Sequence, residues 1–222
     1  IFTSEMVLTD PQPDHYQVAP VDLVLPDAII YAISYNISNG LGKAMEFYRI
    51  TSESEALFRP LYAMYQKSFP LHEQRLPRHQ VEALADPAYH FEAIIENGQL
   101  AGLIGYWLTE AFAYIEHFAV SPELRGRALG SGALEEVGRR HPLVILEIDP
   151  PEDELSIRRE RFYRRLGFQS NDYPHLHPAY RDNFEPHRLV IMTSPRKISV
   201  GEYQDFNRYL AETVMGKCER AF

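Results

Sequence analysis

Residues 114–134 constrain the fold of this chain more than any other stretch. Tyr114 to Val120 is apolar and rich in β-forming residues, and Ser121-Pro122 ends that run. A basic loop with glycine at positions 126, 130 and 132 follows. From Ala133 onward the apolar residues recur with the spacing of a helix. The predicted order is therefore a strand, a glycine-bearing loop and a helix.

The loop has the chemistry of an anion site. Gly126, Gly130 and Gly132 let the backbone approach a ligand closely. The free N–H groups in the first turn of the helix, together with the helix dipole, favour a negative charge there. Arg125 and Arg127 add charge-assisted hydrogen-bond donors. A pyrophosphate group is the expected ligand.

Two motifs in the chain point to one family. The loop fits neither the Rossmann fingerprint nor the P-loop; it reads Arg127-x-x-Gly130-x-Gly132 after a strand ending Ala119-Val120-Ser121-Pro122. This resembles the acyl-CoA-binding motif of the GNAT superfamily of N-acetyltransferases. Phe162-Tyr163-Arg164-Arg165-Leu166-Gly167-Phe168 resembles that family's second signature and follows in the required order. A chance glycine-rich turn would explain the first motif but not both.

The resemblance covers about residues 45–193 and implies an α/β (α+β) fold. Its central sheet is expected to be mixed and mostly antiparallel, with helices on both faces and one parallel pair of strands splayed at the acyl-CoA site. The family uses acetyl-CoA as co-substrate and needs no metal. By resemblance, the cofactor-binding residues are Phe118, Ala119, Val120, Arg125, Gly126, Arg127, Ala128, Leu129, Gly130, Ser131 and Gly132.

The resemblance also implies direct transfer of the acetyl group to an amine bound in the same site. Glu116 is the candidate base that deprotonates the amine, and the alternative is a half-buried glutamate paired with a basic residue. By strand alternation His117 is expected on the opposite face. Tyr163 matches the family tyrosine that protonates the CoA thiolate, and the alternative is an amphipathic core tyrosine. Backbone N–H groups near Phe118 to Val120 are expected beside the thioester carbonyl.

The acceptor is expected to be a cationic primary amine of a small molecule or peptide. The formal charge of -9 argues against nucleic acid and fits a cationic partner. His72 and Glu73 could line a substrate cleft. Other residues proposed for the mouth of the site, where the alternative is a solvated loop, are Glu147, Asp149, Tyr173, His175, His177 and Tyr180. His175-x-His177 is a poor zinc motif.

The chain divides into an extension, residues 1–44, and a catalytic domain, residues 45–222. The extension is acidic and proline-bearing, with one β-like run at residues 28–34. Within the domain, Asn97-Gly98 predicts a hairpin, and an extra helix is expected over residues 200–215. The remaining predicted strands cover residues 46–51, 91–95, 100–107, 113–120, 143–148 and 188–193, and the remaining helices residues 52–67, 77–85, 133–140 and 155–166.

Two further functions are compatible with the same residues. One is an acyl-CoA-binding regulatory module without turnover, and the other is a protein that acts by interaction through residues 1–44. No apolar run is long enough to cross a membrane, and Cys218 is the only cysteine. A cytoplasmic protein is therefore expected, with a homodimer as an open option. The acidic segment that begins at Glu147 and the turn Pro178-Ala-Tyr180 resemble a bacterial subgroup of the family, which implies a bacterial enzyme.

Overall fold

The computed structural model of the protein describes residues 37–39 and 43–218. The strands are β1 (Ile37–Asn39), β2 (Lys43–Ile50), β3 (Tyr89–Glu96), β4 (Gln99–Leu108), β5 (Ala113–Val120), β6 (Val144–Ile148), β7 (Gln169–Ser170), β8 (His175–His177) and β9 (His187–Ser194). The α-helices are α1 (Phe58–Ser68), α2 (Pro77–Leu84), α3 (Leu129–Arg140), α4 (Glu154–Arg165) and α5 (Val200–Tyr209). Short 3-10 turns cover Leu71–Glu73, Pro122–Leu124 and Met215–Lys217, and a π-helical turn covers Leu210–Val214.

The strands form one sheet in the order β1-β2-β3-β4-β5-β6-β9-β7, with β8 paired to β9. Every strand pair is antiparallel except β5 and β6. The β5–α3–β6 crossover explains the parallel pair, because a strand, a helix and a return strand of this length place the two strands side by side in the same direction. The mixed, mostly antiparallel sheet predicted from the sequence is confirmed.

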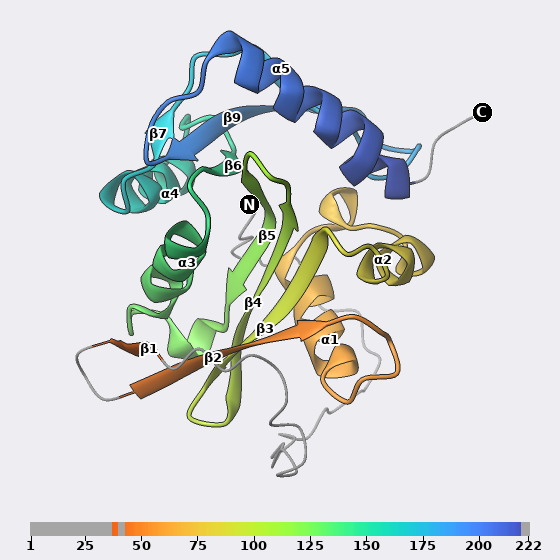
Figure 1. Ribbon diagram of the computed structural model, residues 1–222, viewed down its shortest axis with the longest axis vertical. Helices are drawn as coiled ribbons and strands as arrows, with labels where there is room; N and C mark the ends of the chain where they lie inside the picture. Colours follow the sequence, from red (N-terminus) through yellow and green to blue (C-terminus); the bar gives the residue numbers. More distant parts are fainter. Residues whose placement is uncertain (1–36, 40–42, 219–222) are drawn as a thin grey trace.

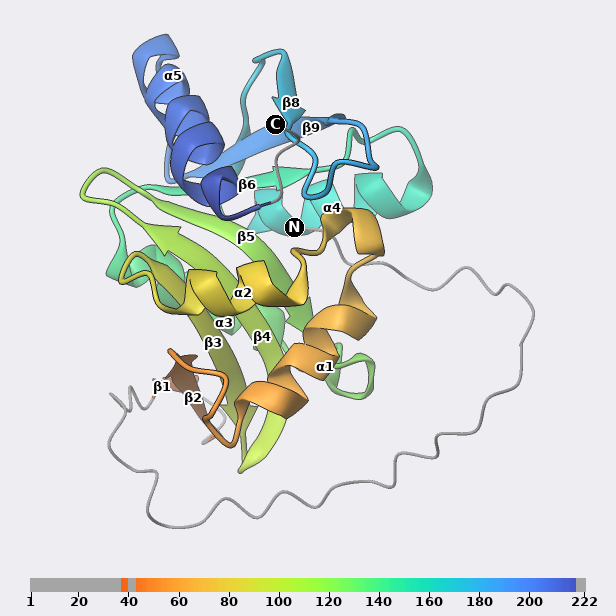
Figure 2. The same cartoon turned by 90° about the vertical axis from the view of Figure 1, so that its right-hand side faces the viewer.

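The sheet separates two hydrophobic cores (Figures 1 and 2). Helices α1 and α2 cover one face, where Leu61 and Tyr65 are completely buried, and α5 packs on the same core through Phe206. Helices α3 and α4 cover the other face through residues such as Val137 and Tyr163. The site described below lies at the parallel pair β5–β6, with its pocket on the face covered by α3 and α4.

The predicted elements agree with the observed ones to within a few residues, except at the start of α1. The sequence predicts a capping box at Ser52, but the helix begins at Phe58. Pro60 explains the shift, because proline lacks an N–H and is tolerated in a first helical turn but not further inside. The capping box predicted at Ser199 and Glu202 is present and starts α5.

Two parts of the structure differ from the sequence-based division of the chain. Strand β2 begins at Lys43, and β1 pairs with it over Ile37–Asn39, so the sheet continues into the segment predicted as an extension. The β-like run at residues 28–34 lies outside the described residues. Strands β7 and β8 lie in the segment between α4 and β9, where the sequence pattern predicts no strand. Within the described ranges, no helix is both long and apolar enough to cross a bilayer.

Candidate functional site

The parallel pair separates part of the way along its length. Strands β5 and β6 are paired only from Ala113 with Val144 to Ile115 with Leu146. The next residues on the two strands are Glu116 and Glu147, and beyond them β5 runs on without its parallel neighbour. The splayed pair expected for an acyl-CoA site is therefore present.

A pocket of about 790 Å³ lies beside the far end of β5, on the face covered by α3 and α4. The strand contributes Phe118 and Val120, and the loop before α3 contributes backbone and side chains from Leu124 onward. Helix α4 closes the other side. The complete lining is Phe118, Val120, Leu124, Arg125, Gly126, Ala128, Leu129, Gly130, Ser131, Leu155, Arg158, Arg159, Phe162, Tyr163 and Arg165.

The start of α3 turns unbonded backbone donors toward this pocket. Gly126 and Ala128 adopt positive φ values of 80° and 61°, and the helix has no side-chain cap. Its first backbone bond from the N-terminus runs from Gly132 N to Ala128 O at 2.9 Å. The N–H groups of the preceding residues have no acceptor inside the helix, so they and the dipole favour an anion.

Most of the predicted cofactor-binding residues line the pocket, and three do not. Ala119 packs on the opposite face of the sheet, among the side chains covered by α1 and α2. Arg127 is exposed outside the pocket lining. At Gly132 an added Cβ would lie 3.1 Å from Met45 Cε, away from the pocket lining. Eight of the eleven predicted residues therefore line one pocket, and their role in binding the cofactor stays a prediction.

Tyr163 lies in the wall that α4 presents to the pocket. Its side chain is 2% exposed and packs edge-on against Phe162 and Phe168. Burial raises the pKa of the Tyr163 hydroxyl, so this group is protonated at neutral pH. Arg159, one turn earlier on α4, also lines the pocket and is paired with Asp149.

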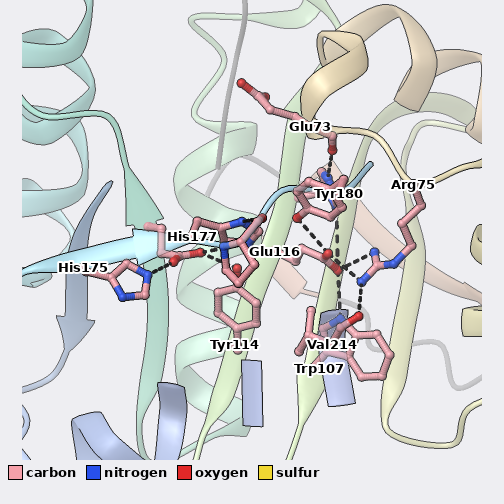
Figure 3. Close-up of polar contacts among 12 residues, drawn as sticks. Glu73, Arg75, Trp107, Tyr114, Glu116, His175, His177, Tyr180 and Val214 are labelled. Atoms are coloured by element: carbon pink, nitrogen blue, oxygen red, sulfur yellow. Dashed lines mark hydrogen bonds and ion pairs between the residues drawn. The ribbon is translucent and has the colours of Figure 1, made fainter. Parts of the chain in front are cut away.

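On the other face of the sheet, a β-bulge places Glu116 and His117 on the same side. The register of β4 with β5 shifts between Gly105 with His117 and Tyr106 with Ile115, which leaves Glu116 as the extra residue. Simple alternation predicted opposite faces, and that prediction is wrong for this pair. His117 packs edge-on against Tyr65, and Glu116 joins the polar cluster shown in Figure 3.

Both carboxylate oxygens of Glu116 accept hydrogen bonds from side chains around them. Arg75 contacts its two carboxylate oxygens at 2.7 and 2.6 Å, and both side chains are fully buried. Trp107 Nε1 donates at 2.8 Å and the Tyr180 hydroxyl at 2.9 Å. Burial would raise the pKa of the Glu116 carboxyl, but the Arg75 guanidinium outweighs it and keeps the pKa below its ordinary value. Arg75 itself was not singled out from the sequence, because a loop arginine carries no local sign of burial.

Glu147 forms a second buried cluster next to the first. His175 and the Tyr114 hydroxyl both hydrogen-bond to its carboxylate, and His177 Nε2 lies 3.8 Å from it. Burial would raise the pKa of Glu147, but His177 and His175 lower it to about 2. His177 stacks on Tyr180, which links the two clusters.

Only some of the residues predicted to line the entrance for a cationic amine lie together in the structure. Glu147, His175, His177 and Tyr180 come together, but they are buried. Asp149 is paired with Arg159 instead, and Tyr173 stacks on Tyr203 with its hydroxyl bonded to Ile198 O at 2.8 Å. In the part of the chain that the structure describes, no group of three or more His, Cys, Asp and Glu side chains is arranged to hold a metal ion.

Comparisons with known proteins agree with this geometry. The model of the Acetyltransferase (GNAT) family matches residues 58–168, a span that contains every residue lining the pocket. A curated protein of Bacillus subtilis (strain 168), provisionally named as a ribosomal-protein-bS18-alanine N-acetyltransferase, is 29% identical over 117 residues, 50% of this chain and 74% of that protein. A solved structure from Bacteroides thetaiotaomicron, provisionally assigned to the GNAT acetyltransferases, is 27% identical with a TM-score of 0.71, and the match covers 77% of this chain and 98% of that one.

Proposed function

Because the chain belongs to the acetyltransferase (GNAT) family, we propose that it transfers the acetyl group of acetyl-CoA to a primary amine of a peptide or small molecule, with both substrates bound at once. The observation that carries this proposal is the position of the pocket. It brings the unbonded N–H groups of α3 and the hydroxyl-bearing Tyr163 together at the point where β5 and β6 separate. Acetyl-CoA supplies the activated acetyl group when bound.

The residues of the pocket fit the charges of CoA. The first turn of α3 offers backbone donors to a pyrophosphate, and Arg125 and Arg158 add positive charge to the lining. The absence of a side chain at Gly130 leaves room in the pocket, because a Cβ there would contact the rings of Phe118 and Phe162 at 3.5 and 3.6 Å. The apolar surface of the same two rings suits the uncharged arm of the molecule.

Tyr163 is proposed as the acid that protonates the departing thiolate. Its protonated hydroxyl suits this role, because a phenol whose pKa is raised still holds its proton when the thiolate forms. The edge-on contacts with Phe162 and Phe168 fix the ring in the pocket wall.

The contacts of Glu116 weigh against its predicted role as the base. A carboxylate that already accepts from Arg75, Trp107 and Tyr180 has no open position for an amine, and its lowered pKa makes it a weak proton acceptor. The alternative given from the sequence, a half-buried glutamate paired with a basic residue, describes the pairing, although the Glu116 side chain is fully buried. We therefore propose that Glu116 positions Arg75 and the loop that carries it.

The acceptor is proposed to enter from the face covered by α1 and α2, opposite the cofactor pocket. The carboxyl groups of Glu73 and Glu147 are buried on that side, and a carboxyl oxygen accepts a hydrogen bond from an amine. The relative named as an alanine N-acetyltransferase supports a peptide α-amine among the candidates. A cytoplasmic location and a homodimer stay predictions from the sequence.

Calorimetry with acetyl-CoA and an assay of CoA release with a panel of amines test the proposal together. We expect the protein to bind acetyl-CoA and Gly130→Val to weaken binding at least about tenfold, because the branched side chain fills the pocket wall. Gly138→Val is the matched control on the same helix, since nothing lies within 4 Å of its added Cβ. Equal affinity in both variants would refute the cofactor site. Binding without CoA release for any amine would favour the regulatory module.

A further inference from the structure

The loop between α1 and α2 is fixed by contacts to its backbone. His117 Nε2 donates to Glu73 O at 2.9 Å, and Arg181 Nε donates to Gln74 O at 3.0 Å. Arg75 N donates to the Tyr65 hydroxyl at 3.0 Å, while its side chain forms the buried pair with Glu116. Whatever side chain stands at position 73 is therefore presented from a rigid backbone.

The carboxyl group of Glu73 is buried and only partly bonded. The residue is 4% exposed, and one carboxyl oxygen, Oε1, lies 3.2 Å from His72 Nε2. The other, Oε2, is buried without any hydrogen-bond partner among the described residues. Leaving a buried polar atom unbonded is unfavourable, and such atoms are rare unless a ligand or a catalytic role accounts for them. In Figure 3 the Glu73 side chain points away from the Glu116 cluster.

The groups whose charges act on this carboxyl come from several elements. His72 is its direct neighbour on the same loop, Asp149 follows β6, and Arg159 projects from α4, pairs with Asp149 and lines the cofactor pocket. His187 at the start of β9 has its ring 6.0 Å from that of His72. Burial, reinforced by the Asp149 carboxylate and opposed by Arg159, raises the pKa of Glu73 to about 8.

We propose that Glu73 is the residue that binds the acceptor amine and takes its proton, through the carboxylate oxygen that has no partner within the protein. This proposal rests on the proposed acetyl transfer. The fixed loop holds the carboxyl within the influence of the Asp149 and Arg159 charges, and Arg159 and Tyr163 line the same pocket. In this proposal the base and the acid therefore come from different elements, the loop before α2 and α4.

Each proton moved in the proposed acetyl transfer is accounted for. Glu73 as carboxylate takes one proton from the ammonium group and becomes a carboxylic acid. The free amine forms the C–N bond, and the C–S bond of the thioester breaks as Tyr163 gives its proton to the sulfur. The proton that the new amide nitrogen then loses restores Tyr163, and Glu73 releases its proton to water. A base with a pKa near 8 suits this exchange, because peptide α-amines have pKa values of about 7.7–8.0.

The test compares Glu73→Gln and Glu73→Asp with Glu82→Gln, an exposed glutamate on α2. The acceptor probes are an alanine-initiated tripeptide and Nα-acetyl-lysine amide. We expect Glu73→Gln to lower kcat/KM at pH 7 by about 10²- to 10⁴-fold. For the tripeptide the loss should be smaller above about pH 9, where most of its α-amine is free, whereas the lysine ε-amine, with a pKa of about 10.4, should still show the loss at that pH. Glu73→Asp should recover part of the rate, and acetyl-CoA affinity and the unfolding temperature should stay unchanged.

Equal activity of Glu73→Gln and Glu82→Gln would overturn the proposal. It would also be overturned if Glu73→Gln lost acetyl-CoA affinity and unfolding temperature along with its activity, because that result marks a structural role. If the protein releases no CoA with any amine, the proposed function fails instead. A ¹³C NMR titration still decides the role of Glu73 in that case. We expect the carboxyl signal missing from Glu73→Gln to titrate well above the ordinary glutamate pKa of about 4.3, and titration near that value refutes the proposal.

Discussion

Replacing Arg75 by methionine should strongly destabilise the protein. The side chains of Arg75 and Glu116 are both fully buried, and the pair is joined by contacts of 2.7 and 2.6 Å. Methionine fills similar volume but leaves the Glu116 charge buried with only the Trp107 and Tyr180 donors. Breaking a buried pair in this way costs about 3–5 kcal/mol. For a domain of this size, that lowers Tm by roughly 6–20 °C.

The loss should depend on pH. In the unchanged protein the pKa of Glu116 is lowered, so its stabilising contribution is present above the unfolded pKa of about 4.3 and is lost as pH falls through the folded value. In Arg75→Met the cation is absent and burial dominates, so the pKa of Glu116 rises above the unfolded value. The variant then loses stability as pH increases from about 4.3 upward. The difference between the two proteins should therefore be largest near pH 8 and should shrink toward pH 5.

Urea unfolding at pH 8 and pH 5 measures both effects. Arg208→Met is the matched control, because Arg208 and Asp205 form an ion pair that is mostly exposed, and its loss should change stability little. The double variant Arg75→Met/Glu116→Gln should be more stable than the sum of the two single losses by at least about 1 kcal/mol, since it contains no uncompensated charge. A loss for Arg75→Met that matches the control, or one that is the same at both pH values, would refute this account of the cluster.

Two other predictions concern the acid and the boundary of the domain. Tyr163→Phe should slow acetyl transfer by about ten- to ten-thousand-fold while acetyl-CoA still binds, as measured by single-turnover kinetics and calorimetry; an unchanged rate would remove Tyr163 from the chemistry. A chain that begins at Met45 should keep its acetyl-CoA affinity as measured by calorimetry. The pairing of β2 with β3 starts at Met45 and Glu96, and every residue that lines the pocket follows Met45 in the chain. Loss of folding or of binding would show that the preceding residues belong to the core.

The parts of the site that depend on neighbouring residues in the sequence could be predicted. The order of strand, glycine loop and helix follows from residues close together in the chain, and each local signal is physical: a proline that ends a strand, glycines that admit positive φ, and an apolar helical stripe. The parallel β5–β6 pair followed from the length of the crossover between them. Tyr163 was placed in the pocket by the motif that ends α4.

The parts that depend on packing between distant segments could not be predicted. Strand alternation failed at Glu116 and His117 because the bulge in β5 is decided by its register with β4, which no local pattern records. Arg75 and Glu116 are 41 residues apart in the chain, and only the folded sheet shows that they neutralise each other. The sequence indicated Glu73, with His72, as a possible lining of a substrate cleft, but it could not show the backbone contact with His117 or the burial of the Glu73 side chain.

The sequence by itself determined the family, the order of the elements and the glycine-bearing loop before α3, because these follow from local backbone preferences and from spacing within one short crossover. The tertiary structure decided which buried carboxylates are paired with cations and which one, Glu73, keeps an oxygen without a partner among the described residues. The reason is that the charge state of a buried carboxyl depends on desolvation and on cations brought close by the fold: Arg75 lowers the pKa of Glu116, whereas burial beside Asp149 raises that of Glu73 to about 8.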